Sequence, residues 1–157
     1  MRSVGEILRF KADRTVHTIK PDASVFEAVK LMAERNIGAL VVTEGDEMVG
    51  MITERDYARK ITLMSRSSKE TMVREIMTSG VIHVDPSQES LECMRLMTER
   101  RVRHLPVIDD GSLVGIVSIG DLVKDIISEQ EFVIQQLEHY ITGEPVWSVP
   151  LHSSASA

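Results

Sequence analysis

Two short stretches of the chain place a glycine, a hydroxyl side chain and a carboxylate at the same spacing. GMITERD occupies residues 50–56, and GIVSIGD occupies residues 115–121. In both, a Thr or Ser precedes an Asp by three residues, which is the spacing of a capping box at the start of a helix. The start of a helix also offers unpaired backbone N–H groups and partial positive charge, which attract phosphate.

The same residues have the chemistry to bind a nucleotide. The hydroxyl of Thr53 or Ser118 is a further donor for phosphate, and the carboxylate of Asp56 or Asp121 can accept hydrogen bonds from both hydroxyls of a ribose. Each glycine lacks a side chain and lets another group approach the backbone closely. Two interpretations therefore stay open: the heptads are helix caps only, or they are helix caps that also bind a nucleotide.

The heptads belong to a longer internal repeat. When the sequence is aligned with itself so that Asp56 falls on Asp121, the segment 21–56 matches the segment 86–121 without a gap. Eleven of the 36 aligned pairs are identical, whereas unrelated sequences of average composition would give about 2. Two copies of one unit indicate a pseudo-symmetric pair that buries a shared face.

Each copy has the pattern of a β-α-β-β-α unit. Short β-prone runs at 15–19 and 80–84 end just before a proline, and apolar residues at helical spacing follow them. Two further β-prone runs, 39–43 and 104–108, lead into turns rich in Gly and Asp, which predict hairpins. A second helix begins at each heptad. We therefore predict an α+β fold built from two pseudo-symmetric repeats.

These patterns divide the chain into four parts. They are a first repeat (1–63), a linker with a short helix (64–79), a second repeat (80–127), and a helical extension with a loose tail (128–157). The final helix is expected to run from Ile119 to about Ile141, because its residues stay partly apolar beyond the repeat. Both a strut that packs on its own domain and an oligomer contact are consistent with this extension.

The composition excludes several classes of function. The net charge of −6 and the aromatic content of 4% argue against a protein that binds nucleic acid or an anionic membrane. No segment has the apolar length of a membrane span, and the N-terminus lacks the apolar core of a secretory signal. The single cysteine, Cys93, cannot form an intramolecular disulfide, and no His or Cys lies at metal spacing. We expect a cytoplasmic protein without a metal site.

The whole pattern resembles the CBS domain, which occurs in tandem pairs called Bateman modules. The resemblance rests on the two heptads, the LPVID stretch at 105–109 and the order of elements, and it covers about residues 15–63 and 80–127. The segment 102–131 is similar in particular to the stand-alone two-CBS proteins of bacteria and plant organelles. The resemblance implies clefts between the repeats that bind AMP, with ADP, ATP, NAD or S-adenosylmethionine as alternatives. It also implies a homodimer formed through the CBS repeats.

The resemblance assigns roles to particular residues. The ribose-binding acids of the family match Asp56 and Asp121, and its phosphate-side hydroxyls match Thr53 and Ser118. The base pocket matches Met51 and Ile116, with Thr78 and Val81 added for the Asp56 site and Thr15 and Val16 added for the Asp121 site.

Basic residues make the two sites unequal. The family often carries basic residues just before the LPV strand, where they reach ligand phosphates, and here they are Arg103 and His104. The matching positions of the first repeat are Gly38 and Ala39, which are uncharged. Arg55 occurs only in the first heptad, where it could compensate by binding phosphate. We therefore expect two adenosine sites that are related but not interchangeable.

The sequence lacks the common signatures of catalysis, such as a P-loop, a nucleophile elbow or an HExxH motif. The leading hypothesis is a regulatory module that binds an adenosine ligand, is not an enzyme, and transmits occupancy to an unidentified protein. The alternatives are an interaction scaffold with vestigial clefts and, less favoured, an adenylate-processing enzyme.

Overall fold

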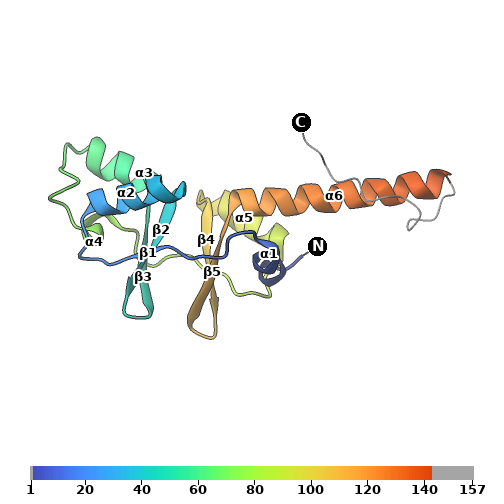
Figure 1. The fold of residues 1–157 in the computed structure, drawn as a ribbon, viewed down its shortest axis with the longest axis horizontal. Helices are drawn as coiled ribbons and strands as arrows, with labels where there is room; N and C mark the ends of the chain where they lie inside the picture. The colour runs from blue at the N-terminus through green and yellow to red at the C-terminus, as the bar shows by residue number, and fades with distance from the viewer. Residues whose placement is uncertain (1, 143–157) are drawn as a thin grey trace.

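The chain folds into two similar halves. The computed structural model describes residues 2–142. Figure 1 shows two antiparallel hairpins next to each other, each with helices at the end opposite its turn. The fold is α+β with two small sheets, and the predicted β-α-β-β-α order is confirmed in the first half.

The first half contains a three-stranded sheet. Its strands are β1 (Thr18–Ile19), β2 (Ala39–Glu44) and β3 (Glu47–Thr53). Its helices are α2 (Val25–Arg35), α3 (Glu54–Tyr57) and the π-helical η1 (Ala58–Thr62). Strand β1 is parallel to β2 and is shorter than the predicted run at 15–19, and β2 pairs antiparallel with β3. Ser24 caps α2 by accepting a hydrogen bond from the N–H of Glu27, as predicted.

The second half has two strands rather than three. Its elements are α5 (Ser90–Arg100), β4 (His104–Asp109), β5 (Ser112–Ser118) and α6 (Ile119–Thr142). The strand predicted at 80–84 is wrong, because in this segment only Val84 pairs, through a single parallel bridge to Val107.

Pro106 explains the lost strand. In the first half, the N–H of Val41 donates to the C=O of His17 and so extends the parallel pairing. Pro106 occupies the position of the second repeat that matches Val41, and it has no N–H to donate to Ile82. Pairing is left to Val84, whose N–H donates to the C=O of Pro106 over 3.0 Å.

Each half is completed by a helix that precedes the other half in the sequence. The two helices are α1 (Val4–Phe10) and α4 (Val73–Ile76). Helix α1 packs on the second half, where the N–H of Val4 donates to the C=O of Gln88; α4 packs on the first half, where the N–H of Val73 donates to the C=O of Ala23. These bonds are equivalent, because Ala23 and Gln88 match in the alignment of the two repeats. Val4 and Val73 are farther apart in the sequence than Ala23 and Gln88 are. The gapless alignment of the repeats therefore does not match α1 with α4.

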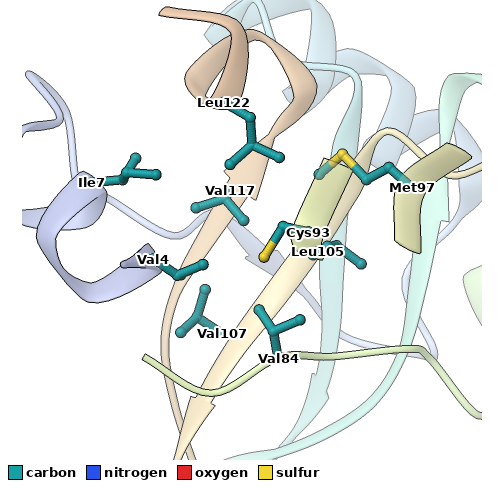
Figure 2. Close-up of a cluster of buried hydrophobic side chains, with 9 residues drawn as sticks. All are labelled: Val4, Ile7, Val84, Cys93, Met97, Leu105, Val107, Val117 and Leu122. Atoms are coloured by element: carbon teal, nitrogen blue, oxygen red, sulfur yellow. The ribbon is translucent and has the colours of Figure 1, made fainter. Parts of the chain in front are cut away.

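Two apolar cores hold the halves. The core of the second half, drawn in Figure 2, contains Val4, Ile7, Val84, Cys93, Met97, Leu105, Val107, Val117 and Leu122. The core of the first half contains Val25, Ala28, Met32, Leu40, Val42, Ile52, Ile61, Val73 and Ile76. Cys93 is fully buried, and this burial raises the pKa of its thiol to about 11, so it is an inert core residue.

Helix α6 confirms the predicted final helix, since it ends at Thr142. It packs against α5, β5 and α1 near its start, and its C-terminal part extends away from the two hairpins (Figure 1). Of the helices in residues 2–142, none is long and apolar enough to cross a membrane. The predicted loose tail falls on residues 143–157, outside the described part of the chain.

Candidate functional site

The first heptad forms a complete capping box at the start of α3. The N–H of Asp56 donates to Oγ1 of Thr53 over 3.1 Å, and the N–H of Thr53 donates to Oδ2 of Asp56 over 2.9 Å. The hydroxyl of Thr53 also donates to this carboxylate oxygen, over 3.1 Å. Asp56 is only 8% exposed, and the capping box predicted at this heptad, which both interpretations share, is confirmed.

Lys60 binds the other oxygen of the Asp56 carboxylate. Its Nζ lies 3.1 Å from Oδ1 of Asp56 and donates to the C=O of Ile76 over 2.8 Å. A carboxylate has about four lone-pair sites, and the two donor groups of Thr53 share Oδ2. A further hydrogen-bond donor, such as a ribose hydroxyl, can therefore reach Oδ1 without breaking the cap.

Asp56 lies at a large cavity that both halves line. Its volume is about 1120 Å³, which is above the roughly 300–1,000 Å³ of common small-ligand pockets. The predicted site residues that line it are Met51, Thr53, Arg55, Asp56, Thr78, Val81, Arg103 and His104. A mononucleotide therefore has room beside Asp56.

Two residues predicted for the base pocket, Met51 and Thr78, line the cavity and pair through their backbones. Met51 and Thr78 exchange two hydrogen bonds, of 3.0 Å and 2.8 Å, which join β3 to the linker. A Cβ at Gly50 would lie 2.8 Å from the carbonyl oxygen of Thr78. At Gly115, the same test brings the Cβ to 2.7 Å from Cδ1 of Leu8. The group admitted by each heptad glycine is thus a segment of the protein itself.

Cationic side chains crowd this cavity. Arg55, Arg103 and His104 all line it, so Arg55 adds to the charge of the other residues rather than compensating for their absence elsewhere. Three further arginines line it: Arg59, Arg100 and Arg101. The guanidinium of Arg55 is held in place because it donates to the C=O of Arg101 over 2.8 Å. Five arginines against two acidic side chains give the cavity the charge that a phosphate requires.

His104 starts β4 at the edge of the cavity. Burial lowers the pKa of its imidazole, and the positive charge of Lys11 lowers it further; the charges of Asp121 and Glu54 act in the opposite sense, and that of Arg103 lowers it again. The imidazole is therefore neutral at pH 7. A neutral imidazole can donate or accept a hydrogen bond, and a bound anion would raise its pKa.

The second heptad forms the same cap, but a different cation binds its carboxylate. The N–H of Asp121 donates to Oγ of Ser118 over 3.2 Å, and the N–H of Ser118 donates to Oδ2 of Asp121 over 2.8 Å. Lys11, which follows α1, places its Nζ 3.0 Å from the same Oδ2 and donates to the C=O of Ile116 over 3.1 Å. Lys11 thus bridges the residues predicted to bind ribose and base at this site.

The residues predicted for the second site do not line the large cavity. They are Asp121, Ser118, Ile116, Thr15 and Val16. Val16 and Ile116 instead pack against a small central cluster of Ala39, Val41 and Met51, between the two hairpins. The two heptads are therefore alike in their caps and unlike in what surrounds them.

Sequence reasoning missed both lysines. Lys60 follows Asp56 by four residues, a spacing that indicates an ion pair on one helix face. This contact could therefore have been predicted from the sequence. Lys11 is far from Asp121 along the chain, and no sequence pattern connects the two residues.

Comparison with known proteins identifies the family. The family model for the CBS domain matches residues 4–63 and 73–128. The chain belongs to the CBS-domain family. It is 47% identical over 149 residues to the CBS domain-containing protein CBSX3, mitochondrial, of Arabidopsis thaliana, covering 90% of this chain and 72% of that protein. The predicted tandem-CBS type is confirmed. The cytoplasmic location stays a prediction, since the name of this relative places it in the mitochondrion.

Solved structures of CBS pairs share the fold. A putative signal-transduction protein with CBS domains from Burkholderia ambifaria MC40-6 is 56% identical, with a TM-score of 0.79, covering 82% of this chain and 96% of that chain. The CBS domain pair of protein MJ0100, in complex with 5′-methylthioadenosine and S-adenosyl-L-methionine, is 26% identical, with a TM-score of 0.71, covering 82% of this chain and 98% of that chain. The Bateman-module fold is confirmed, and one CBS pair of this fold binds adenosine-containing ligands.

Proposed function

We propose that this protein is a regulatory module that binds an adenosine-containing nucleotide at Asp56 and transmits occupancy to another protein. The observation that carries the proposal is the 1120 Å³ cavity, because it brings together the Asp56 carboxylate and the cationic side chains of both halves. AMP is the expected ligand, with ADP, ATP, NAD and S-adenosylmethionine as alternatives. Binding of adenosine compounds by the CBS pair of MJ0100 supports this choice of ligand class.

The positions of the lining residues order the nucleotide along the cavity. The ribose hydroxyls donate to Oδ1 of Asp56, which Lys60 already approaches from one side. The base lies against Met51 and the backbone at Thr78, where β3 meets the linker. The phosphates extend toward Arg103 in the opposite half. A bound nucleotide therefore bridges the two halves, which gives occupancy a structural consequence that a partner protein can recognise.

We propose one nucleotide per chain rather than two. Lys11 donates to both Oδ2 of Asp121 and the Ile116 carbonyl, so its side chain lies between the residues expected to bind the ribose and the base at the second heptad. Lys60 instead donates to the carbonyl of Ile76, which is not among the residues predicted for the base. The Lys11 contact refines the expected inequality of the two sites into one open site and one closed site.

Isothermal titration of the purified chain with AMP, ADP, ATP, NAD and S-adenosylmethionine tests the proposal. We expect saturable binding of at least one of them, with one site per chain. A thermal melt in the presence of that compound should show stabilisation, because ligand at 100 times its Kd adds about 2.7 kcal/mol to the free energy of unfolding.

Two results would contradict the proposal. The absence of binding and of any melting shift with all five compounds would favour the scaffold with vestigial clefts. If chromatography detected the release of adenosine or phosphate from AMP or ATP, an enzyme would be favoured. We also propose, as expected from the resemblance, that the chain forms a homodimer through its CBS repeats. Equilibrium sedimentation of a variant that ends before residue 128 tests this proposal.

A further inference from the structure

Helix α6 carries an apolar stripe at strict heptad spacing. The α6 stripe consists of Val123, Ile127, Gln130, Ile134, Leu137 and Ile141. Its members are separated alternately by four and three residues, and its five apolar members are 41–81% exposed. A mean spacing of 3.5 residues is that of a coiled-coil seam, whereas a helix packed on a globular core follows a spacing of 3.6.

The stripe lies on a different side of α6 from the residues that anchor the helix. Leu122 and Asp125 are buried where α6 meets α5, β5 and α1. His139, the buried residue farther along, is two residues from both Leu137 and Ile141, so it points to the opposite face. The C-terminal part of the helix extends away from the hairpins (Figure 1). The stripe is therefore an exposed row of five apolar side chains and one glutamine, and exposed apolar surface of this extent marks an interaction site.

We propose that the α6 stripe binds the α6 stripe of a second copy of this chain as an antiparallel two-helix coiled coil. The stripe itself supports a second copy, since a heptad seam is self-complementary. Its two flanks fix the orientation, because one flank is charged and the other is apolar.

The charged flank consists of Lys124, Glu131 and Glu138, and the apolar flank consists of Ile126, Val133 and Tyr140. In a parallel pair, the charged flank of one helix would face the apolar flank of the other. In an antiparallel pair, each flank faces its own counterpart, so apolar side chains meet apolar side chains. Only the antiparallel orientation avoids burying three charged residues against apolar ones.

The antiparallel arrangement also defines a register around a twofold axis. Its layers pair Val123 with Ile141, Ile127 with Leu137, and Gln130 with Ile134, so that the numbers of each pair sum to 264. In this register Lys124 of one copy lies beside Glu138 of the other, on both sides of the axis. Glu131 of one chain faces Glu131 of the other chain at the twofold axis, and this is the one like-charge contact of the charged flank.

Sedimentation equilibrium of the full chain tests the association. The double variant I134D/L137D should have half the mass of the wild-type assembly, because it places carboxylates in two layers of the seam. The control is F132D, which makes the same kind of change at an exposed residue of the opposite face (59% exposed), and it should keep the wild-type mass. An unchanged mass in I134D/L137D, with the circular dichroism of a folded chain, would overturn the proposal.

Cysteine crosslinking tests the orientation. I127C and L137C, carrying tags of different size, should form a mixed disulfide dimer when combined, whereas neither variant alone should crosslink efficiently. Cys93 does not interfere, because it is fully buried. Crosslinking of I127C with itself would indicate a parallel pair and overturn the proposed arrangement, and so would the lack of any crosslink.

A charge exchange tests the register. K124E should raise the dissociation constant of the assembly, since it sets two carboxylates beside each other, and K124E/E138K should restore the wild-type value. Equal losses in the single and the double variant would contradict the pairing of Lys124 with Glu138. These results do not depend on nucleotide binding, so they are separate from the test of the Asp56 cleft.

Discussion

The two heptads share the reciprocal hydrogen bonds of a helix cap and differ in their surroundings. In both, a hydroxyl and an Asp cap a helix reciprocally. The lysine that binds Asp56 comes from the next turn of the same helical run, whereas the lysine that binds Asp121 comes from the segment after α1. The duplication thus preserved the cap, but the segments beside the two heptads differ, and Asp56 lines the large cavity whereas Asp121 does not. A repeated motif predicts local geometry better than it predicts function.

The strongest test of this comparison is to remove each carboxylate in turn. We expect Asp56→Ala to weaken AMP binding about 10- to 100-fold, because hydrogen bonds to a charged group contribute roughly 1.5–3 kcal/mol. Asp121→Ala should change the affinity less than about twofold. Both variants lose a cap of similar energy, about 1 kcal/mol, so urea unfolding controls for stability. Equal losses of affinity in the two titrations would show that the sites are equivalent.

Removing a cation of the opposite half should have the next largest effect. Arg103→Ala should weaken AMP binding about tenfold through the loss of a charge-assisted hydrogen bond, and it should leave adenosine binding nearly unchanged. Titration of the variant with both compounds gives the two ratios. If adenosine and AMP lose the same factor, Arg103 acts on the shape of the cavity and not on the phosphate.

Opening the second heptad should change the number of nucleotides bound. Lys11→Met removes the ammonium that occupies Asp121 and the Ile116 carbonyl, and it should raise the stoichiometry from one nucleotide to two per chain in a native mass spectrum. The cost to stability is about 1 kcal/mol or more, because the Lys11 and Asp121 side chains are only 25% and 15% exposed. Lys60→Met, which frees the other carboxylate, is the control and should keep the stoichiometry at one. A value of one in both variants would mean that Lys11 does not close the site.

The smallest effect concerns His104, which is influenced by charges of both heptads. Its pKa is lowered in the folded protein, mainly by burial, so the unfolded chain binds more protons below about pH 6.5. The free energy of unfolding should therefore decrease as the pH falls below that value. Urea unfolding between pH 5 and 8 should show this decrease in the wild type and a flatter curve in His104→Gln. A wild-type curve parallel to that of the variant would contradict the lowered pKa.

The features that could be predicted from the sequence are those that depend on residues a few positions apart in the chain. The three-residue spacing from Thr53 to Asp56 predicted the cap, and the apolar periodicity predicted α6 to within a residue of Thr142. The repeat predicted that both halves carry hairpins. Each of these signals depends on neighbours in the chain, where backbone geometry alone decides the outcome.

The features that sequence could not predict depend on which segments meet in space. The residues at 80–84 predicted a strand, but Pro106 on the neighbouring strand leaves only Val84 paired. Arg55 was expected to stand in for Arg103, but both line one cavity, because that cavity lies between the halves. The contact of Lys11 with Asp121 arises from the exchange of α1 and α4 between the halves, which a gapless alignment conceals.

The exchanged position of α1 has a consequence for the order of events at the ribosome. Val4 and Ile7 are synthesised well before the residues that bury them, which include Val117 and Leu122. The first half can assemble as soon as α4 has emerged, while α1 must wait without its final partners until β5 and the start of α6 have been made. Because contacts between distant parts of a chain form slowly, the emergence of β5 and the start of α6, rather than local helix formation, should set the moment at which the second half folds.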